Sequence, residues 1–143
     1  MTIKQLSVFV ENKKGRLTDI TKLLAQNSID ISALSLADTS DFGVLRLIVN
    51  DVDKAKSVLN AAGIIVKITD VLAIVIDDHP GSCSEVLQVM SDNDIAIEYM
   101  YACAGRKSGK ALMIARADDP EKAQQILSEN GYGKEQASDI YKI

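Results

Sequence analysis

The alternation of apolar and polar positions in the first half of the chain predicts the order strand, helix, strand, strand, helix, strand. The strands show period-two alternation, and the helices show apolar residues three and four positions apart. Asp51 is the expected N-cap of the second helix, and Gly63 is its expected C-terminal stop. The predicted strands are residues 3–10, 29–36, 44–49 and 64–69, and the helices carry their apolar residues within 17–24 and 52–62.

The second half of the chain repeats this pattern. Gly15 falls on Gly81, 66 residues later, and Gly63 falls on Gly131, 68 residues later, because the second copy has a longer hairpin. Apolar positions, charged positions and terminal glycines all stay in step, which indicates a duplicated module. The predicted domains are a first module, residues 1–69, and a second module, residues 70–143.

The ends of the elements carry clearer signals in the second module. Ser82 and Glu85 have the spacing of a capping box, and Asp119 followed by Pro120 predicts an N-cap and a proline at the first helical position. The last strand is predicted at residues 138–143. No turn residues separate the modules, so the last strand of the first is expected to run directly into the first strand of the second.

A βαββαβ order with both helices on one face of the sheet is the ferredoxin-like arrangement, an α+β fold. The sequence therefore predicts two tandem ferredoxin-like modules, each with an antiparallel sheet and with helices on one face. This fold serves many unrelated functions, so the function has to be argued from individual residues.

Composition narrows the possible functions. Of 143 residues, 47% are hydrophobic and 25% are charged, which is typical of a globular protein. The net charge of -4, the two Phe and the lack of Trp disfavour a nucleic-acid partner, because such binding needs a positive face and aromatic rings. The longest charge-free apolar run, residues 71–76, is far shorter than the ~20 residues of a membrane span, so no membrane partner is expected.

The candidate chemistry does not predict an enzyme, a cofactor or a metal site. The single histidine, His79, lies near Ser82 and Cys83 but at no known catalytic spacing. The basic hairpin at 104–110 lacks the spacing of a phosphate loop; we interpret it as a solvated hairpin, with an anion-contacting flap as the alternative. Cys83 and Cys103 are interpreted as small buried apolar residues, and with no visible export signal the predicted location is the reducing cytoplasm.

The first loop of each module is the most informative segment for function. Residues 12–17 and residues 78–82 each join the end of a strand to the start of a helix, and each contains a glycine. Glycine lets a ligand come close to the backbone, and the free N–H groups of the first helical turn suit a small carboxylate. The alternative interpretation is a plain strand-to-helix turn.

These loops, the βαββαβ order and the duplication together resemble the ACT family of amino-acid-sensing domains over essentially the whole chain. Asp78-His79-Pro80-Gly81 matches the family loop D/N-x-P-G, and in Asn12-Lys13-Lys14-Gly15 a lysine stands where the motif has proline. The resemblance implies a ligand held between the first loop of one module and the start of the second strand of its neighbour. Carried over by position, the first site takes Asn12, Gly15, Arg16 and Leu17 with Ile95, Ala96 and Ile97, and the second takes Asp78, His79, Pro80, Gly81, Ser82 and Cys83 with Ile29, Asp30 and Ile31.

The resemblance thus implies a cytoplasmic, non-catalytic regulatory protein whose ligand is a free amino acid. Its protein partner is expected to be a second copy, giving a homodimer, or a regulated enzyme. In the second site, Asp78 and Asp30 supply two carboxylates for the α-ammonium group, whereas the first site is almost neutral. The alternative function is a ligand-free ferredoxin-like scaffold for dimerisation or protein docking.

Overall fold

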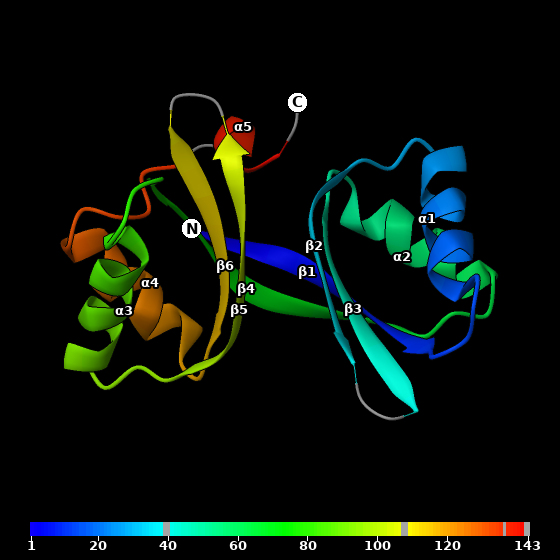
Figure 1. The fold of residues 1–143 in the computed structure, drawn as a ribbon, viewed down its shortest axis with the longest axis horizontal. Helices are drawn as coiled ribbons and strands as arrows, with labels where there is room; N and C mark the ends of the chain where they lie inside the picture. Colours follow the sequence, from blue (N-terminus) through cyan, green and yellow to red (C-terminus); the bar gives the residue numbers. More distant parts are fainter. Residues whose placement is uncertain (39–40, 107–108, 136, 142–143) are drawn as a thin grey trace. The chain divides into compact units, whose positions relative to one another are not determined.

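A computed structural model describes residues 1–38, 41–106, 109–135 and 137–141 (Figure 1). The chain divides into two compact units: the first unit comprises residues 4–69 and Tyr141, and the second unit comprises residues 1–3 and 70–140. The elements are β1 (Thr2–Glu11), α1 (Arg16–Gln26), β2 (Ile31–Asp38), β3 (Phe42–Val49), α2 (Val52–Ala61), β4 (Val66–Asp77), α3 (Ser82–Asp92), β5 (Ile97–Arg106), β6 (Lys110–Ala117), α4 (Pro120–Glu129) and α5 (Ala137–Ile140).

The first unit contains the antiparallel strands β2, β3 and β1, in that order, with α1 and α2 on one face (Figure 1). The register pairs Val10 with Gly43 and Leu36 with Leu45. Alternate strand residues point toward the helices and form the core. The central buried residues of this core are Leu6, Val8, Ile20, Leu24, Leu45, Leu47, Ala55 and Leu59.

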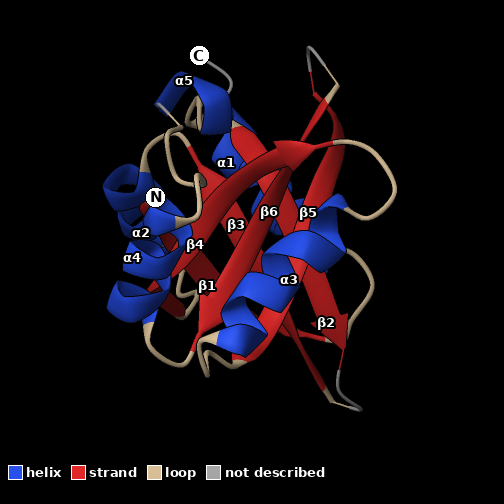
Figure 2. Ribbon diagram, turned by 90° about the vertical axis from the view of Figure 1, so that its left-hand side faces the viewer, coloured by secondary structure: helices blue, strands red, loops and turns tan. Residues whose placement is uncertain are grey.

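The second unit repeats this architecture with β4, β6 and β5, covered on one face by α3 and α4 (Figures 1 and 2). Its register pairs Ile76 with Ala111 and Ala102 with Met113. The central buried residues of its core are Leu72, Ile74, Val86, Met90, Met113, Ala117, Ala123 and Leu127. The predicted fold class, tandem ferredoxin-like modules with antiparallel sheets and helices on one face, is confirmed.

The helix ends explain why the repeat is visible in the sequence. Asp51 and Asp119 cap α2 and α4, each accepting a hydrogen bond of 3.0 Å from the backbone N–H three residues later, as predicted. Gly63 and Gly131 follow the two helices with positive φ, and the pair of backbone bonds that closes each end is a Schellman motif. The predicted capping box at Ser82 is wrong: Gly81 is the N-cap of α3, and Ser82 is its first helical residue.

The predicted last strand, residues 138–143, is also wrong in the part that the structure describes. Residues 137–140 form the short helix α5. The reason lies at β4, where the Ala73 N–H donates to the Met1 carbonyl and the Met1 amino nitrogen donates to the Ala73 carbonyl, with N···O distances of 2.8 and 3.3 Å, as in an antiparallel pair. Farther along, the Val75 N–H donates to Glu135 Oε1 at 3.1 Å. These groups already occupy the edge of β4 that a fourth strand of the second unit would use.

Candidate functional site

The first loops of the two units share one backbone geometry. Gly15 precedes α1 with φ +85°, and Gly81 precedes α3 with φ +96°, so both N-caps are in the left-handed region. Neither helix receives a side-chain hydrogen bond at its N-cap from the part of the chain that the structure describes. A Cβ at either glycine would meet no described atom within 4 Å. The first N–H of each helix donates to a carbonyl of the loop, Arg16 to Lys13 and Ser82 to His79, both at 3.3 Å. The helix starts therefore lack a side-chain cap, and the space around the glycine that precedes each of them is open.

Each loop is also tied to the hairpin of its own sheet. The Asn12 N–H donates to the Asp41 carbonyl at 3.3 Å, and the Asp78 N–H donates to the Gly109 carbonyl at 2.8 Å. The side chains of Asn12 and Asp78 are exposed. These bonds fix the backbone of the two predicted site residues and leave the amide and the carboxylate available to a ligand.

Charged neighbours of the loops differ between the units. In the first unit, Glu11 Oε2 lies 3.1 Å from Lys13 Nζ and 3.6 Å from an Arg16 guanidinium nitrogen. The hydrogen bond from Lys13, and then the charges of Lys13 and Arg16, hold the pKa of the Glu11 carboxyl below its usual value. At the matching position, Asp77 pairs with Lys110, whose hydrogen bond lowers the pKa of the Asp77 carboxyl.

The His79 side chain contacts two other residues of the second loop. Its ring nitrogens lie 3.0 and 3.2 Å from the Ser82 hydroxyl, and Nδ1 lies 3.0 Å from the Pro80 carbonyl. Ser82 is buried, and its hydroxyl contacts the His79 ring. The arrangement stabilises the turn that leads into α3.

The starts of the second strands form the other half of each predicted site. The Asp30 N–H donates to Asn50 Oδ1 at 3.0 Å, and the matching Ala96 N–H donates to Asp118 Oδ1 at 3.1 Å. The preceding residues, Ile29 and Ile95, are buried in the two cores, and the following residues, Ile31 and Ile97, are half-buried. The side chains of Asp30 and Ala96 are exposed. Buried neighbours and a side-chain bond thus hold an outward-facing residue at the same place in both units.

Within one unit, the loop and the strand start do not meet. They lie at opposite ends of α1 in the first unit and of α3 in the second, and each helix has 11 residues. A helix of that length spans about 16 Å, which is too far for one amino acid to bridge. A site made of both halves therefore does not form within one unit.

Each loop opens on a cavity within its own unit. In the first unit, a cavity of about 300 Å³ is lined by Asn12, Gly15 and Leu17 from the predicted site, and also by Val10, Leu36 and Gly43. In the second unit, Gly81 and Cys83 line an open depression of about 590 Å³ along α3. Sequence reasoning missed Val10, Leu36 and Gly43, because only the strand register brings them under the loop.

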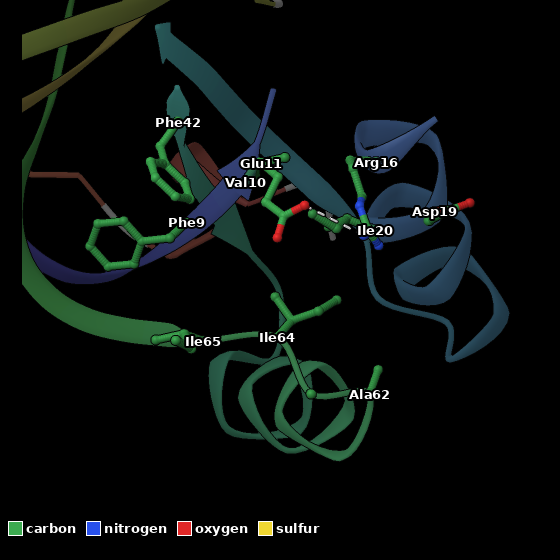
Figure 3. Close-up of a pocket in the computed structure, with 11 residues that line it drawn as sticks. Phe9, Val10, Glu11, Arg16, Asp19, Ile20, Phe42, Ala62, Ile64 and Ile65 are labelled. Carbon is green, nitrogen blue, oxygen red and sulfur yellow. Dashed lines mark ion pairs between the residues drawn. The ribbon is translucent and has the colours of Figure 1, made fainter. Parts of the chain in front are cut away.

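A second cavity of the first unit, of about 310 Å³, shares Val10 and Glu11 with the loop cavity and extends to residues 62–65. Figure 3 shows Phe9 and Phe42 on one side of it and the Glu11–Arg16 ion pair above Ile64. Arg16 lines this cavity and is absent from the lining of the loop cavity. Of the four residues predicted for the site at the first loop, Arg16 is therefore the one that lines the second cavity instead of the loop cavity.

Other candidate chemistry is sparse. Cys83 is exposed and Cys103 is half-buried, so the prediction of two buried cysteines is wrong; both are free thiols. Cys83 is the second residue of α3, on the side of the helix away from the core.

Among the described residues, no three His, Cys, Asp or Glu side chains gather as a metal site. No helix in the described part of the chain has the length and apolarity to cross a membrane. The basic hairpin predicted at 104–110 lies partly outside the described residues.

A family comparison supports the interpretation of this duplicated frame. The model of a family described as the ACT domain pair matches residues 1–141. The chain belongs to the ACT domain pair family. No curated protein sequence matches this ACT domain pair.

Solved structures agree with the assignment. The crystal structure of protein BT0572 from Bacteroides thetaiotaomicron is 42% identical, with a TM-score of 0.92, over 100% of this chain and 98% of that one. The ligand-free regulatory subunit of aspartate kinase from Thermus thermophilus is 13% identical, with a TM-score of 0.64, over 90% of this chain and 94% of that one. The corresponding subunit from Thermus flavus has a TM-score of 0.61 at 14% identity, over 90% of this chain and 94% of that one. The last two similarities concern the fold.

Proposed function

We propose that this ACT domain pair is a non-catalytic regulatory protein that binds a free amino acid and signals its presence to a partner protein. The observation that carries the proposal is the pair of helix starts without a side-chain cap, each preceded by a left-handed glycine with open space around it. Such a terminus offers N–H donors and a partial positive charge to an α-carboxylate. Structural similarity to subunits named as regulatory gives additional support.

The proposed binding mode joins the first loop of one unit to the second-strand start of another, in the same chain or in a second copy. It is supported by the length of α1 and α3, which keeps the two halves of a site apart within a unit. One site then contains Asn12 with Ala96, and the other contains Asp78 with Asp30. The pairing of carboxylates favours the α-ammonium group at the second site.

Binding strength is expected to differ between these sites. A hydrogen bond between a carboxylate and an ammonium group contributes roughly 1.5–3 kcal/mol, which is about ten- to a hundredfold in affinity. The Asp78–Asp30 site should therefore bind more tightly.

We propose a cytoplasmic location and no cofactor, with either a second copy or a regulated enzyme as the protein partner. The alternative function is a ligand-free docking scaffold. It is favoured by the exposure of Phe9, Leu34 and Phe42, which are 51, 53 and 54% exposed in the first unit. A sensor and a scaffold differ in one measurable property, which is stabilisation by free amino acids.

The test is a thermal-shift screen with the twenty amino acids, followed by calorimetry. Ligand at ~100 times its dissociation constant adds about 2.7 kcal/mol to the free energy of unfolding. The amine that lacks the α-carboxylate of the best ligand is the control and should give no shift.

Variants then test which of the two sites binds more tightly. Asp30→Ala should weaken the tighter site by about ten- to a hundredfold. If Asn12→Ala abolishes the tighter site instead, the two sites are assigned in the wrong order; if no amino acid binds at millimolar concentration, the scaffold function is favoured.

A further inference from the structure

The cavity under the first loop differs from a general amino-acid site in the chemistry of its walls. Three apolar side chains from three elements line it: Val10 of β1, Leu17 of α1 and Leu36 of β2. Val10 is 6% exposed, whereas Leu17 and Leu36 are 37 and 47% exposed. The polar part of the lining is Glu11 at the end of β1, which is paired with Lys13, together with Asn12, Lys13 and Lys14 of the loop. Its volume of about 300 Å³ is at the lower end of the range for small-molecule pockets.

Gly43 forms the remaining wall, and its backbone does not require a glycine. Its φ is not positive, unlike that of Gly15 or Gly81, and it lies in the regular ladder of β3 opposite Val10. Glycine within a strand is otherwise unfavourable, since it adds conformational entropy to the unfolded chain and packs no side chain. The missing side chain would point to the face on which Val10 lies, because directly paired residues share a face.

A side chain at position 43 would change the cavity through Leu36. A Cβ built on Gly43 would lie 3.1 Å from Leu36 Cδ1, which is closer than ordinary van der Waals contact. Leu36 would have to move, and Leu36 is itself a wall of the cavity. Glycine at this position therefore keeps space open between β2, β3 and the first loop.

The second unit carries different residues at the matching register positions. Ala111 is opposite Ile76 as Gly43 is opposite Val10, and Ala102 is opposite Met113 as Leu36 is opposite Leu45. Ala111 is buried and Ala102 is exposed. The large apolar wall and the missing side chain thus occur together in the first unit, whereas the second unit has a methyl group at each position.

We infer that the first unit's loop cavity selects an amino acid with an aliphatic side chain, and that Gly43 and Leu36 together set the size of the side chain it accepts. The inference rests on the proposed function, because the α-carboxylate is held at the start of α1 as described there. The ligand's side chain lies against Val10, Leu17 and Leu36. Each methylene moved from water to such a wall strengthens binding about fourfold.

The test is calorimetry of the full chain with alanine, valine and leucine, with threonine and asparagine as polar counterparts of similar shape. Valine should bind about fifteenfold more tightly than alanine, since two carbons are added. Threonine should bind at least about fivefold more weakly than valine, because its hydroxyl gains no partner from the apolar wall. Equal affinities for valine and threonine, or for leucine and asparagine, would overturn the inference.

Variants then test whether the selectivity for aliphatic side chains comes from Gly43 and Leu36. Gly43→Ala should weaken leucine binding about fivefold or more and leave alanine binding unchanged, since overpacking affects only a ligand that fills the space. Leu36→Ala should weaken valine binding and reduce the difference between valine and threonine, which keeps the test valid if Gly43→Ala fails to fold. The matched control is Ala111→Gly in the second unit, which should leave the first unit's selectivity unchanged.

The possible failures are distinguishable. If amino acids bind but Gly43→Ala changes all of them equally, position 43 does not set the size and this inference fails while the proposed function stands. If Ala111→Gly alters the valine-to-alanine ratio as strongly as Gly43→Ala does, the selective cavity is not in the first unit. If none of the five amino acids binds, the aliphatic selectivity is wrong; the screen of all twenty then decides the proposed function separately.

Discussion

The first and second units share the parts that fix the backbone and differ in the side chains around the loops. Both have a left-handed glycine before the first helix and a side-chain bond from Asn50 or Asp118 to the start of the second strand. Around the loops, Glu11 pairs with Lys13 and Arg16 in one unit, and His79 packs on Ser82 in the other. A duplicated frame that keeps its geometry while the exposed groups diverge is suited to two unequal binding sites.

The two units also differ in how their sheets are completed. The second unit takes residues 1–3 from the opposite end of the chain to cover the edge of β4. Glu135 extends this cover by accepting from the Val75 N–H. The integrity of the second unit therefore depends on a segment that precedes the whole first unit in sequence.

The largest expected effect on stability comes from changing residues 1–3, which complete the second unit. Ile3 is 5% exposed, so Ile3→Ala should lower the free energy of unfolding by about 2–5 kcal/mol. Deletion of residues 1–3 should cost more, because the backbone pairing with Ala73 is lost as well. Urea unfolding measures the loss, and hydrogen exchange should show the Ala73 amide losing protection before the amides of β3. Phe9→Ala, on an exposed position of the same strand, is the control; an equal cost there would contradict the argument.

The next effect concerns the glycines that precede α1 and α3. Gly15→Ala and Gly81→Ala should each destabilise the protein by about 1–2 kcal/mol, because a residue with a Cβ is strained in the left-handed region. The space around each Cβ is open, so the cost is conformational rather than steric. Asparagine tolerates this region, so Gly81→Asn should cost less than Gly81→Ala. Thermal melts compare the variants, and a Gly81→Ala protein as stable as the parent would show that the loop backbone can relax.

A smaller loss of stability is expected when the side chain that holds the start of the second strand is removed from either unit. Asn50→Ala removes the acceptor for the Asp30 N–H and should cost about 1 kcal/mol. Asp118→Ala should cost more, since Asp118 Oδ1 accepts from the N–H groups of both Ala96 and Asp119, at 3.1 and 2.9 Å. Urea unfolding of the two variants decides the order. The conservative change Asn50→Asp keeps an acceptor and should recover most of the loss; an Asn50→Ala cost above that of Asp118→Ala would reverse the comparison.

The smallest effect is the dependence of stability on pH at the two surface carboxyls. The pKa values of Glu11 and Asp77 are lowered in the folded state, so each carboxylate stabilises the fold at neutral pH and loses this contribution as the pH falls through its folded pKa. Glu11→Gln and Asp77→Asn should therefore lower the urea midpoint slightly at neutral pH and not at all in strong acid. Both groups are fully exposed, so added salt should reduce the difference. A difference that persists in acid would point to packing instead of charge.

Sequence reasoning succeeded where the signal is local. The caps at Asp51 and Asp119, the stops at Gly63 and Gly131 and the alternation of buried strand residues follow from short-range rules, and together they predict the fold. It failed where distant segments compete. The edge of β4 is occupied by Met1, so the C-terminal segment forms α5 instead of a strand. The left-handed Gly81 displaced Ser82 as the N-cap.

Candidate site residues were predictable to a similar extent. The loops with Asn12 and Asp78 follow from a local pattern, and the structure gives them the expected helix starts. The wall of the loop cavity could not be predicted from this local pattern. Leu36 and Gly43 come close to Val10 only because of the register in which β2, β3 and β1 pair. Cys83 was misassigned as buried, since nothing in the sequence around it shows that the second residue of α3 lies away from the core.

The pairing of Met1 with Ala73 has a consequence for the order in which the protein is made. The two residues are 72 positions apart, so during synthesis Met1 has no partner until the whole first unit and part of β4 have followed. Contacts of such long sequence separation form late, because the entropy of closing the intervening loop must be overcome first. During synthesis the first unit can complete its core while residues 1–3 remain unpaired. The second unit becomes complete only when residues 1–3 join it, so the slowest folding step should be measurable as protection of the Ala73 amide.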